Sequence, residues 1–146
     1  MKFGSFDRQL WSLVNDALNS PMQPPICVLT ADQRDNWALA RDYLIQLDPR
    51  NKEMLRWIET SLFVLCLDDY ASPDSYDQGF RAWPHSLSHN LSLLENMAYA
   101  MDGHNRWYDK TISIICMSNG RGGMNGEHSP CDALIPSRLM DWLVEK

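Results

Sequence analysis

The sequence predicts an α/β protein in which helices pack on a mixed β-sheet. Apolar residues recur every three or four positions through the first third of the chain, which is the spacing of amphipathic helices. Strand-like runs come later, as the compact apolar segment Leu62–Leu67 and the β-branched segment Thr111–Met117. Helices therefore come first and strands are inserted later, with no internal repeat or low-complexity segment.

Three helices are predicted before the first strand. The first ends near Asn19-Ser20-Pro21 and leads, through a turn at Pro21–Pro25, into a short extended run at Ile26–Leu29. Its apolar face consists of Phe6, Leu10, Leu13, Val14, Ala17 and Leu18.

The second predicted helix reaches about Leu47, and the third begins at Asp48-Pro49. Thr30 or Asp32 would cap the second helix, since both side chains accept hydrogen bonds from free helix N–H groups. Proline suits the first turn of the third helix, where its missing N–H does no harm. We expect the two helices to turn these apolar residues inward: Trp37, Ala40, Leu44, Leu47, Met54, Leu55, Ile58 and Leu62.

A buried strand and two further helical segments are predicted in the middle of the chain. Leu62–Leu67 is an uninterrupted apolar run of strand length. Ser72-Pro73-Asp74 opens a helical turn or helix that lasts up to Pro84. Residues 86–100 predict an amphipathic helix whose apolar face carries Leu87, Leu91, Leu94, Met97 and Ala98.

A β-hairpin is predicted in the last third of the chain. Asn119-Gly120 favours a type I′ turn, because both central positions of that turn need positive φ. Gly122–Glu127 would then return antiparallel to Thr111–Met117 and bring His128 to the end of a strand. The glycines match no phosphate-binding loop, so Gly122 and Gly123 are interpreted as a bulge or a site of close packing.

Composition limits the classes of partner and compartment. The 146 residues can bury the core of one domain, and the net charge of −6 argues against nucleic acid or an anionic membrane as the main partner. The longest apolar run is far too short to span a bilayer, and no signal peptide is evident. Four widely spaced cysteines, three of them in apolar runs, indicate reduced, buried thiols in an intracellular protein. Six tryptophans and eight methionines would fill the core or form an apolar surface for a partner domain.

His128 is the first candidate for chemistry. Imidazole takes and returns a proton near neutral pH, and a base at the end of a hairpin meets its substrate at a defined place. A structural histidine is the alternative, and it is the one that the spacing of His128 and Asp132 alone would favour. Cys131 is a candidate nucleophile, although no neighbour in the sequence would activate its thiol.

A pair of histidines offers a metal-binding alternative. His85 and His89 lie four residues apart, which on a helix would put both rings on one face. No glutamate follows His85, and no third ligand lies at a set spacing. A polar helix start is therefore the preferred interpretation, and no metal site is predicted.

Three stretches of the chain form an ordered set of motifs. Asn105–Lys110 is followed by an apolar strand, a glycine turn and Glu127–Asp132. Upstream, Pro24–Thr30 precedes Arg34–Ala38, which has the pattern R-(D/N)-x-W, and Ser61–Asp68 lies between the two regions. Together these stretches resemble the choline/carnitine acyltransferase family, in which the first set is the active-site signature.

The resemblance implies reversible transfer of an acyl group, expected to be acetyl, between coenzyme A and carnitine, and hence a role in fatty acid metabolism. Nε2 of His128 would deprotonate the carnitine hydroxyl or, in the reverse direction, the coenzyme A thiol, with no acyl-enzyme. Acyl-coenzyme A and carnitine would be substrates, and no cofactor would be tightly bound. The implied fold is a partial chloramphenicol-acetyltransferase-like lobe, and the implied compartment is the mitochondrion or the peroxisome.

The resemblance also assigns roles around His128. It implies that Asp132 braces the turn through an arginine while the histidine bonds to its own backbone carbonyl, so Asp132 is a support and not a triad member. Glu127 should point to the opposite face from His128 and support the site through other partners. Ala133 stands where the family usually has glycine, which costs about 1 kcal/mol if that position needs positive φ. The residues expected to form scaffold are Arg106, Trp107, Asp109 and Lys110.

Family members are several times longer than this chain, so residues 1–146 are expected to be part of a domain that ends just after the catalytic histidine. Residues 1–23 would be an N-terminal helix and linker, and residues 24–146 the matching segment. The groups that bind coenzyme A and carnitine would lie beyond residue 146, in a C-terminal half of the same domain, so the chain alone would be inactive. The alternatives are a choline O-acetyltransferase-type acceptor and a truncated, non-catalytic interaction domain.

Overall fold

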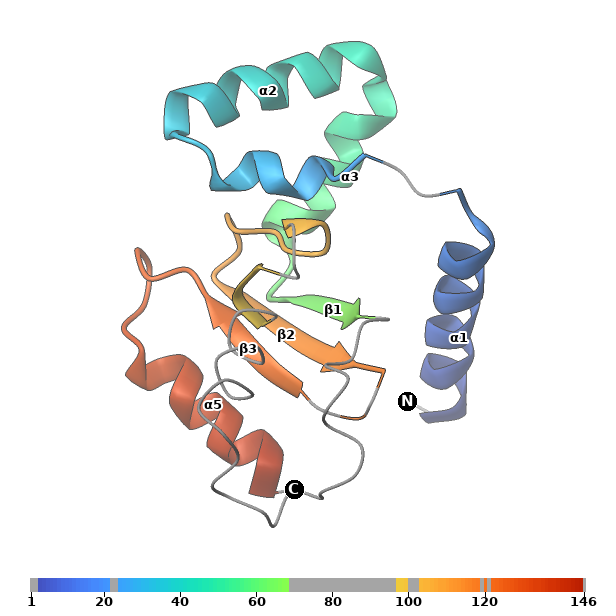
Figure 1. The fold of residues 1–146 in the computed structure, drawn as a ribbon, viewed down its shortest axis with the longest axis vertical. Coiled ribbons are helices and arrows are strands. Elements are labelled where there is room, and N and C mark those ends of the chain that lie inside the picture. The colour runs from blue at the N-terminus through green and yellow to red at the C-terminus, as the bar shows by residue number, and fades with distance from the viewer. Residues whose placement is uncertain are drawn as a thin grey trace.

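A computed structural model of the chain describes residues 3–21, 24–68, 97–99, 103–118, 120 and 122–145. Its helices and strands confirm the α/β class (Figure 1). The helices before the sheet are α1 (Phe3–Asn19), the short 3₁₀ helix η1 (Ile26–Ala31), α2 (Arg34–Leu47) and α3 (Pro49–Thr60). The later elements are β1 (Val64–Asp68), β2 (Ile112–Met117), β3 (Gly122–Gly126) and α5 (Leu134–Glu145).

The described strands form a mixed sheet in the order β1-β2-β3. β1 runs parallel to β2, with Cys66 opposite Ile115, and β3 runs antiparallel to β2, with Met124 opposite Ile114. Figure 1 shows α2 and α3 at one end of the molecule, with the sheet beyond them and α5 beside β3. The mixed sheet and the hairpin of β2 and β3 are therefore as predicted.

The core lies on the central strand β2. Ile115 and Met117 are buried against Cys66 of β1. β1 is less buried than predicted, since Leu65 and Leu67 are exposed and only Cys66 is buried. The strand also begins at Val64, which leaves Leu62 in the turn after α3, where it is 83% exposed. The prediction of a buried run over Leu62–Leu67 is therefore wrong for most of its residues.

Two glycines of the hairpin are required for different reasons, Gly120 for its positive φ and Gly123 for the close approach of a side chain. Gly120 adopts φ of 78°, which glycine tolerates, and its N–H donates to the carbonyl of Met117 at 3.0 Å. Gly120 is therefore the last residue of a turn that starts at Met117, and Cys116 pairs with Gly122, so the predicted two-residue turn centred on Asn119-Gly120 is wrong. A Cβ on Gly123 would lie 2.3 Å from Sδ of Met97. Close packing is thus the correct interpretation at Gly123.

The residues before α2 form a 3₁₀ helix rather than the predicted extended run. Backbone hydrogen bonds three residues apart, such as Asp32 N–H to the carbonyl of Leu29 at 3.3 Å, close the turns of η1. The hydroxyl of Thr30 adds a bond to the carbonyl of Cys27 at 2.7 Å. The apolar run Ile26–Leu29 was too short for its spacing to distinguish a strand from a helical turn.

Gln33, and neither Thr30 nor Asp32, caps α2. Its side-chain oxygen accepts hydrogen bonds from the N–H groups of Asp35 and Asn36. The hydroxyl of Thr30 is already bonded within η1, so the predicted cap is wrong by one to three positions.

α3 begins as predicted, because Asp48 caps it and accepts a hydrogen bond from the N–H of Arg50 at 2.8 Å. The side chain of Arg50 also donates to this carboxyl and holds its pKa down at about 2. Leu55 is buried as expected, whereas Met54 is 56% exposed, since one residue turns the chain by about 100° around a helix axis. Leu47 of α2 is likewise exposed, at 60%.

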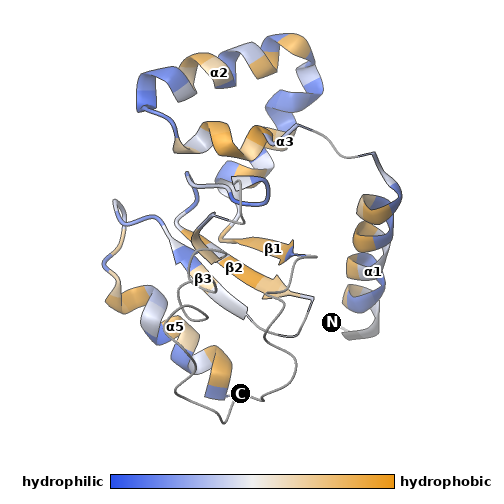
Figure 2. Ribbon diagram, in the orientation of Figure 1, coloured by the Kyte–Doolittle hydropathy of each residue, from blue (hydrophilic) through white to orange (hydrophobic). Residues whose placement is uncertain are grey.

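α1 forms where the periodicity predicted it, but much of its apolar face is exposed. Trp11, Leu13 and Leu18 are 67%, 63% and 68% exposed. Figure 2 shows apolar residues recurring along the length of this helix. Of the two explanations for the many tryptophans, an apolar surface therefore applies to Trp11, and core filling to Trp37, which is 5% exposed.

The predicted helices at 72–84 and 86–100 lie largely outside the described residues, and residues 97–99 are helical. His85 and His89 also lie outside them. Among the helices that the structure describes, none has the length and apolar character needed to cross a membrane.

Candidate active site

His128 follows β3 by two residues, at the end of the hairpin where the sequence placed it. Its side chain is 75% exposed. The preceding residue is tied to the sheet, because the N–H of Glu127 donates to the carbonyl of Thr111 at 3.2 Å. The backbone before His128 is therefore held against the end of the sheet, while the imidazole itself is exposed.

The carboxylate of Glu127 accepts hydrogen bonds from the residue that follows His128. One carboxylate oxygen, Oε1, accepts hydrogen bonds from the N–H of Ser129 at 3.1 Å and from its hydroxyl at 2.6 Å. The partner of Glu127 is therefore Ser129, which the sequence analysis did not single out. The spacing in the sequence could have indicated this contact, because a serine two residues after a glutamate on a turn can reach its carboxylate.

Asp132 lies at the start of α5. Its Oδ1 accepts a hydrogen bond from the N–H of Ala133 at 2.7 Å and lies 3.7 Å from Nε2 of His128. That second distance is too long for a hydrogen bond, so the two side chains attract each other only when the imidazole is protonated. Among the described residues no arginine contacts this carboxylate, so the brace through an arginine that the resemblance implied stays a prediction.

Ala133 takes part in the first turn of α5, since its carbonyl accepts from the N–H of Ser137 at 3.2 Å and from the hydroxyl of Ser137 at 2.8 Å.

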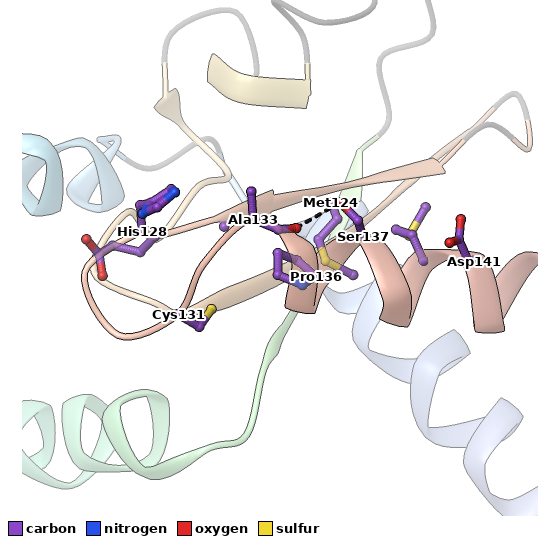
Figure 3. Close-up of a pocket in the computed structure, with 10 residues that line it drawn as sticks. Met124, His128, Cys131, Ala133, Pro136, Ser137 and Asp141 are labelled. Atoms are coloured by element: carbon purple, nitrogen blue, oxygen red, sulfur yellow. Dashed lines mark hydrogen bonds between the residues drawn. The ribbon is translucent and has the colours of Figure 1, made fainter.

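A hollow of about 460 Å³ lies between the end of β3 and α5. Figure 3 shows His128 at one end of it and Asp141 of α5 at the other. Its walls combine apolar side chains with a few polar groups. The lining residues are Met124, Gly126, Glu127, His128, Cys131, Ala133, Pro136, Ser137, Met140 and Asp141.

The four cysteines are free thiols in different surroundings. Burial raises the pKa of the Cys27 and Cys66 thiols, which makes them poor nucleophiles. Cys116, predicted to be buried, is exposed because its side chain points to the opposite face of β2 from Ile115 and Met117. Cys131 is half-buried and lines the hollow near His128.

The residues before β2 connect the hairpin to the helices. The carboxylate of Asp109 accepts a hydrogen bond from Nε1 of Trp37 at 2.8 Å and pairs with Arg34. The ring of Trp37 meets that of Trp107 edge-on at 5.7 Å. The upstream motif and the active-site motif thus meet in space through their most distinctive residues.

Lys110 and Arg106 are buried, and each has hydrogen-bond partners of its own. Nζ of Lys110 donates to the carbonyls of Ile58 at 2.6 Å and Glu59 at 3.2 Å, at the end of α3. Arg106, 1% exposed, forms two hydrogen bonds with the carboxylate of Asp68, at 2.7 and 3.0 Å. These contacts agree with a scaffold role for both residues.

The described residues contain no group of three or more side chains that could hold a metal ion.

Comparison with known proteins finds a family model and relatives that match most of the chain. The sequence model of the choline/carnitine O-acyltransferase family matches residues 2–146. The chain is 34% identical to peroxisomal carnitine O-octanoyltransferase of Rattus norvegicus over 95% of its own length. It is 35% identical to choline O-acetyltransferase of Mus musculus over 97% of its length. The chain spans only 21% of each of these two relatives.

Proposed function

This chain belongs to the choline/carnitine O-acyltransferase family, and we propose that its His128 is the general base in acyl transfer between coenzyme A and carnitine. The observation that carries the proposal is the exposed imidazole, held by its backbone at the end of a strand and beside a hollow with apolar walls. A base must reach the proton that it removes, and a ring enclosed by protein could not.

In the proposed reaction, Nε2 of His128 takes the proton of the carnitine hydroxyl. The resulting alkoxide attacks the thioester carbonyl of acyl-coenzyme A, and the bond from carbon to sulfur breaks as the tetrahedral intermediate collapses. The imidazolium then returns its proton to the departing thiolate. Acyl-coenzyme A is thus a substrate, and no tightly bound cofactor is needed.

Glu127 and Asp132 are proposed as supports of His128. Glu127 restrains the backbone on either side of the histidine, and the carboxylate of Asp132 lies 3.7 Å from Nε2. Their substitution should therefore lower activity less than loss of the imidazole.

The test replaces the matching segment of the rat octanoyltransferase with this chain and measures thiol release from acetyl- and octanoyl-coenzyme A in the presence of carnitine. His128→Ala should lower kcat by about 10²- to 10⁴-fold, the usual contribution of a general base. Cys131→Ala distinguishes a general base at His128 from a nucleophile at Cys131. If Cys131→Ala lost turnover while His128→Ala retained it, the thiol and not the imidazole would be the reacting group. The expected preference for acetyl groups is tested by comparing the two acyl donors in the natural full-length product, because the chimaera takes its coenzyme A-binding groups from the octanoyltransferase.

A choline acceptor is the second candidate, since the identity to choline O-acetyltransferase is as high as that to the octanoyltransferase. Because the groups that bind the acceptor are expected beyond residue 146, an assay of the natural full-length product with choline and with carnitine distinguishes the two acceptors. The 146-residue chain alone is proposed to be inactive, and turnover that required His128 in the isolated chain would contradict this.

We also propose a peroxisomal location, which is supported by the names of the carnitine octanoyltransferase relatives. Co-localisation of the natural full-length product with a peroxisomal marker tests it, and a cytosolic distribution would contradict it.

A further inference from the structure

We propose that Ser129 is a positioning residue that, through the carboxylate of Glu127, fixes the backbone of His128. The inference rests on the proposed role of His128 and adds a residue to that site.

The contact between Glu127 and Ser129 closes a ring around His128. Oε1 of Glu127 accepts from the N–H of Ser129 at 3.1 Å and from its hydroxyl at 2.6 Å. His128 is the one residue between them, so these bonds span its two peptide links. Two donors on one carboxylate oxygen hold the turn more firmly than a single neutral hydrogen bond, because bonds to an ionised acceptor are the stronger ones.

Both ends of this ring are restrained. The N–H of Glu127 is bonded to the carbonyl of Thr111 at 3.2 Å, which extends the pairing of β2 with β3 by one residue. On the other side, Pro130 follows Ser129 and disfavours helical dihedrals there, while its own φ is locked. The position of His128 therefore depends on the sheet at one end and on a stiff dipeptide at the other.

The imidazole itself has little to hold it. Its side chain is 75% exposed, and the oxygen of Asp132 lies 3.7 Å from Nε2, beyond hydrogen-bond distance. Because few contacts fix the exposed ring, its position depends on the backbone of His128. The hydrogen bonds between Glu127 and Ser129 restrain that backbone.

The first test measures amide hydrogen exchange at residue 129 in the full chain by NMR, corrected for intrinsic rates. Ser129→Ala removes the hydroxyl but keeps the N–H, and it should speed exchange about threefold to tenfold, as expected for one exposed hydrogen bond. Ser129→Thr, which keeps a hydroxyl, should restore the rate. The matched control is Ser20→Ala, since the hydroxyl of Ser20 is also exposed and bonds to a carbonyl, that of Asp16, at 2.7 Å.

A double substitution makes the test sharper. Glu127→Ala removes the acceptor for both bonds, so Ser129→Ala should add no further effect in its presence. Additive effects, or an unchanged rate in Glu127→Ala, would overturn the proposal. Glu127→Gln gives a second comparison should either alanine variant fail to fold, because it keeps an acceptor oxygen without the charge and should lie between wild type and Glu127→Ala.

A catalytic readout uses the chimaera described above. Ser129→Ala should lower kcat about threefold to tenfold, leave KM for acyl-coenzyme A within about twofold, and be rescued by Ser129→Thr. An equal loss in both Ser129 variants would overturn the positioning role. If His128→Ala kept full turnover while the exchange effects persisted, the general-base proposal would fail and the backbone contact would stand.

Discussion

His128 combines an exposed side chain with a restrained backbone. The ring is open to solvent, while the residues on both sides of it make hydrogen bonds at 3.2, 3.1 and 2.6 Å. For the proposed reaction, Nε2 is thus open to solvent among the residues that the structure describes. In the proposed acyl transfer, the described residues around the His128 ring leave it open to water, so other groups would have to exclude water from the site.

Lys110 is the scaffold residue whose loss should be felt most directly at the hairpin. Lys110→Met keeps the aliphatic stem and removes two hydrogen bonds to carbonyls at the end of α3. We expect the free energy of unfolding to fall by about 1–3 kcal/mol, since two carbonyls at the end of α3 lose the donor that the buried Lys110 supplies. Urea denaturation measures this, with exposed Lys52→Met of α3 as the matched control. Equal losses in the two variants would show that the ammonium contacts contribute nothing.

At the scale of elements, one loop connects α2, α3 and the hairpin. Asp109 contacts Trp37 and Arg34, which are 72 and 75 residues away in the sequence. The next residue, Lys110, binds the end of α3 directly before β2 begins. Helices that look separate from the sheet in Figure 1 therefore determine where the hairpin starts.

The close packing of β3 is testable at Gly123. A Cβ there would lie 2.3 Å from the sulfur of Met97, so Gly123→Ala should destabilise the fold by about 1–3 kcal/mol. Met97→Ala in the same chain should recover part of this loss, because the clash is with a flexible side chain. Gly4→Ala, where a Cβ meets nothing within 4 Å, is the control. Thermal unfolding would contradict the packing argument if both glycine variants behaved alike.

At the scale of the whole molecule, many large apolar side chains of the described residues are exposed to solvent. On α5, Leu134 and Val144 are 73% and 74% exposed, and α1 exposes Trp11 and Leu18. The chain spans 21% of its relatives, and a surface of this kind suits contact with further protein.

We therefore expect the isolated chain to bind an apolar fluorescent dye and to associate as its concentration rises. Leu18→Gln and Val144→Gln should lower both effects, because each removes exposed apolar area. Sedimentation analysis of the wild type and the two variants measures the association. A chain that stayed monomeric and bound no dye would contradict the interpretation.

The sequence by itself determined the local structure and the candidate base. α1, the start of α3 and β2 follow from periodicity, a proline after an aspartate and β-branching. The positive φ of Gly120 follows from a residue type that tolerates it. Each of these properties depends on residues within a few positions of one another. The motif around His128 is local in the same sense, and so the sequence was sufficient to select it.

Only the tertiary structure decided which apolar residues are buried and what the polar residues contact. Leu62 and Met54 fit an inward pattern and are exposed, because burial depends on neighbours that are distant in the sequence. The partners of Asp109 come from another helix, and the choice of Ser129 by Glu127 depends on how the chain turns after β3. Such contacts follow from the spatial arrangement of the elements, which spacing along the chain does not specify.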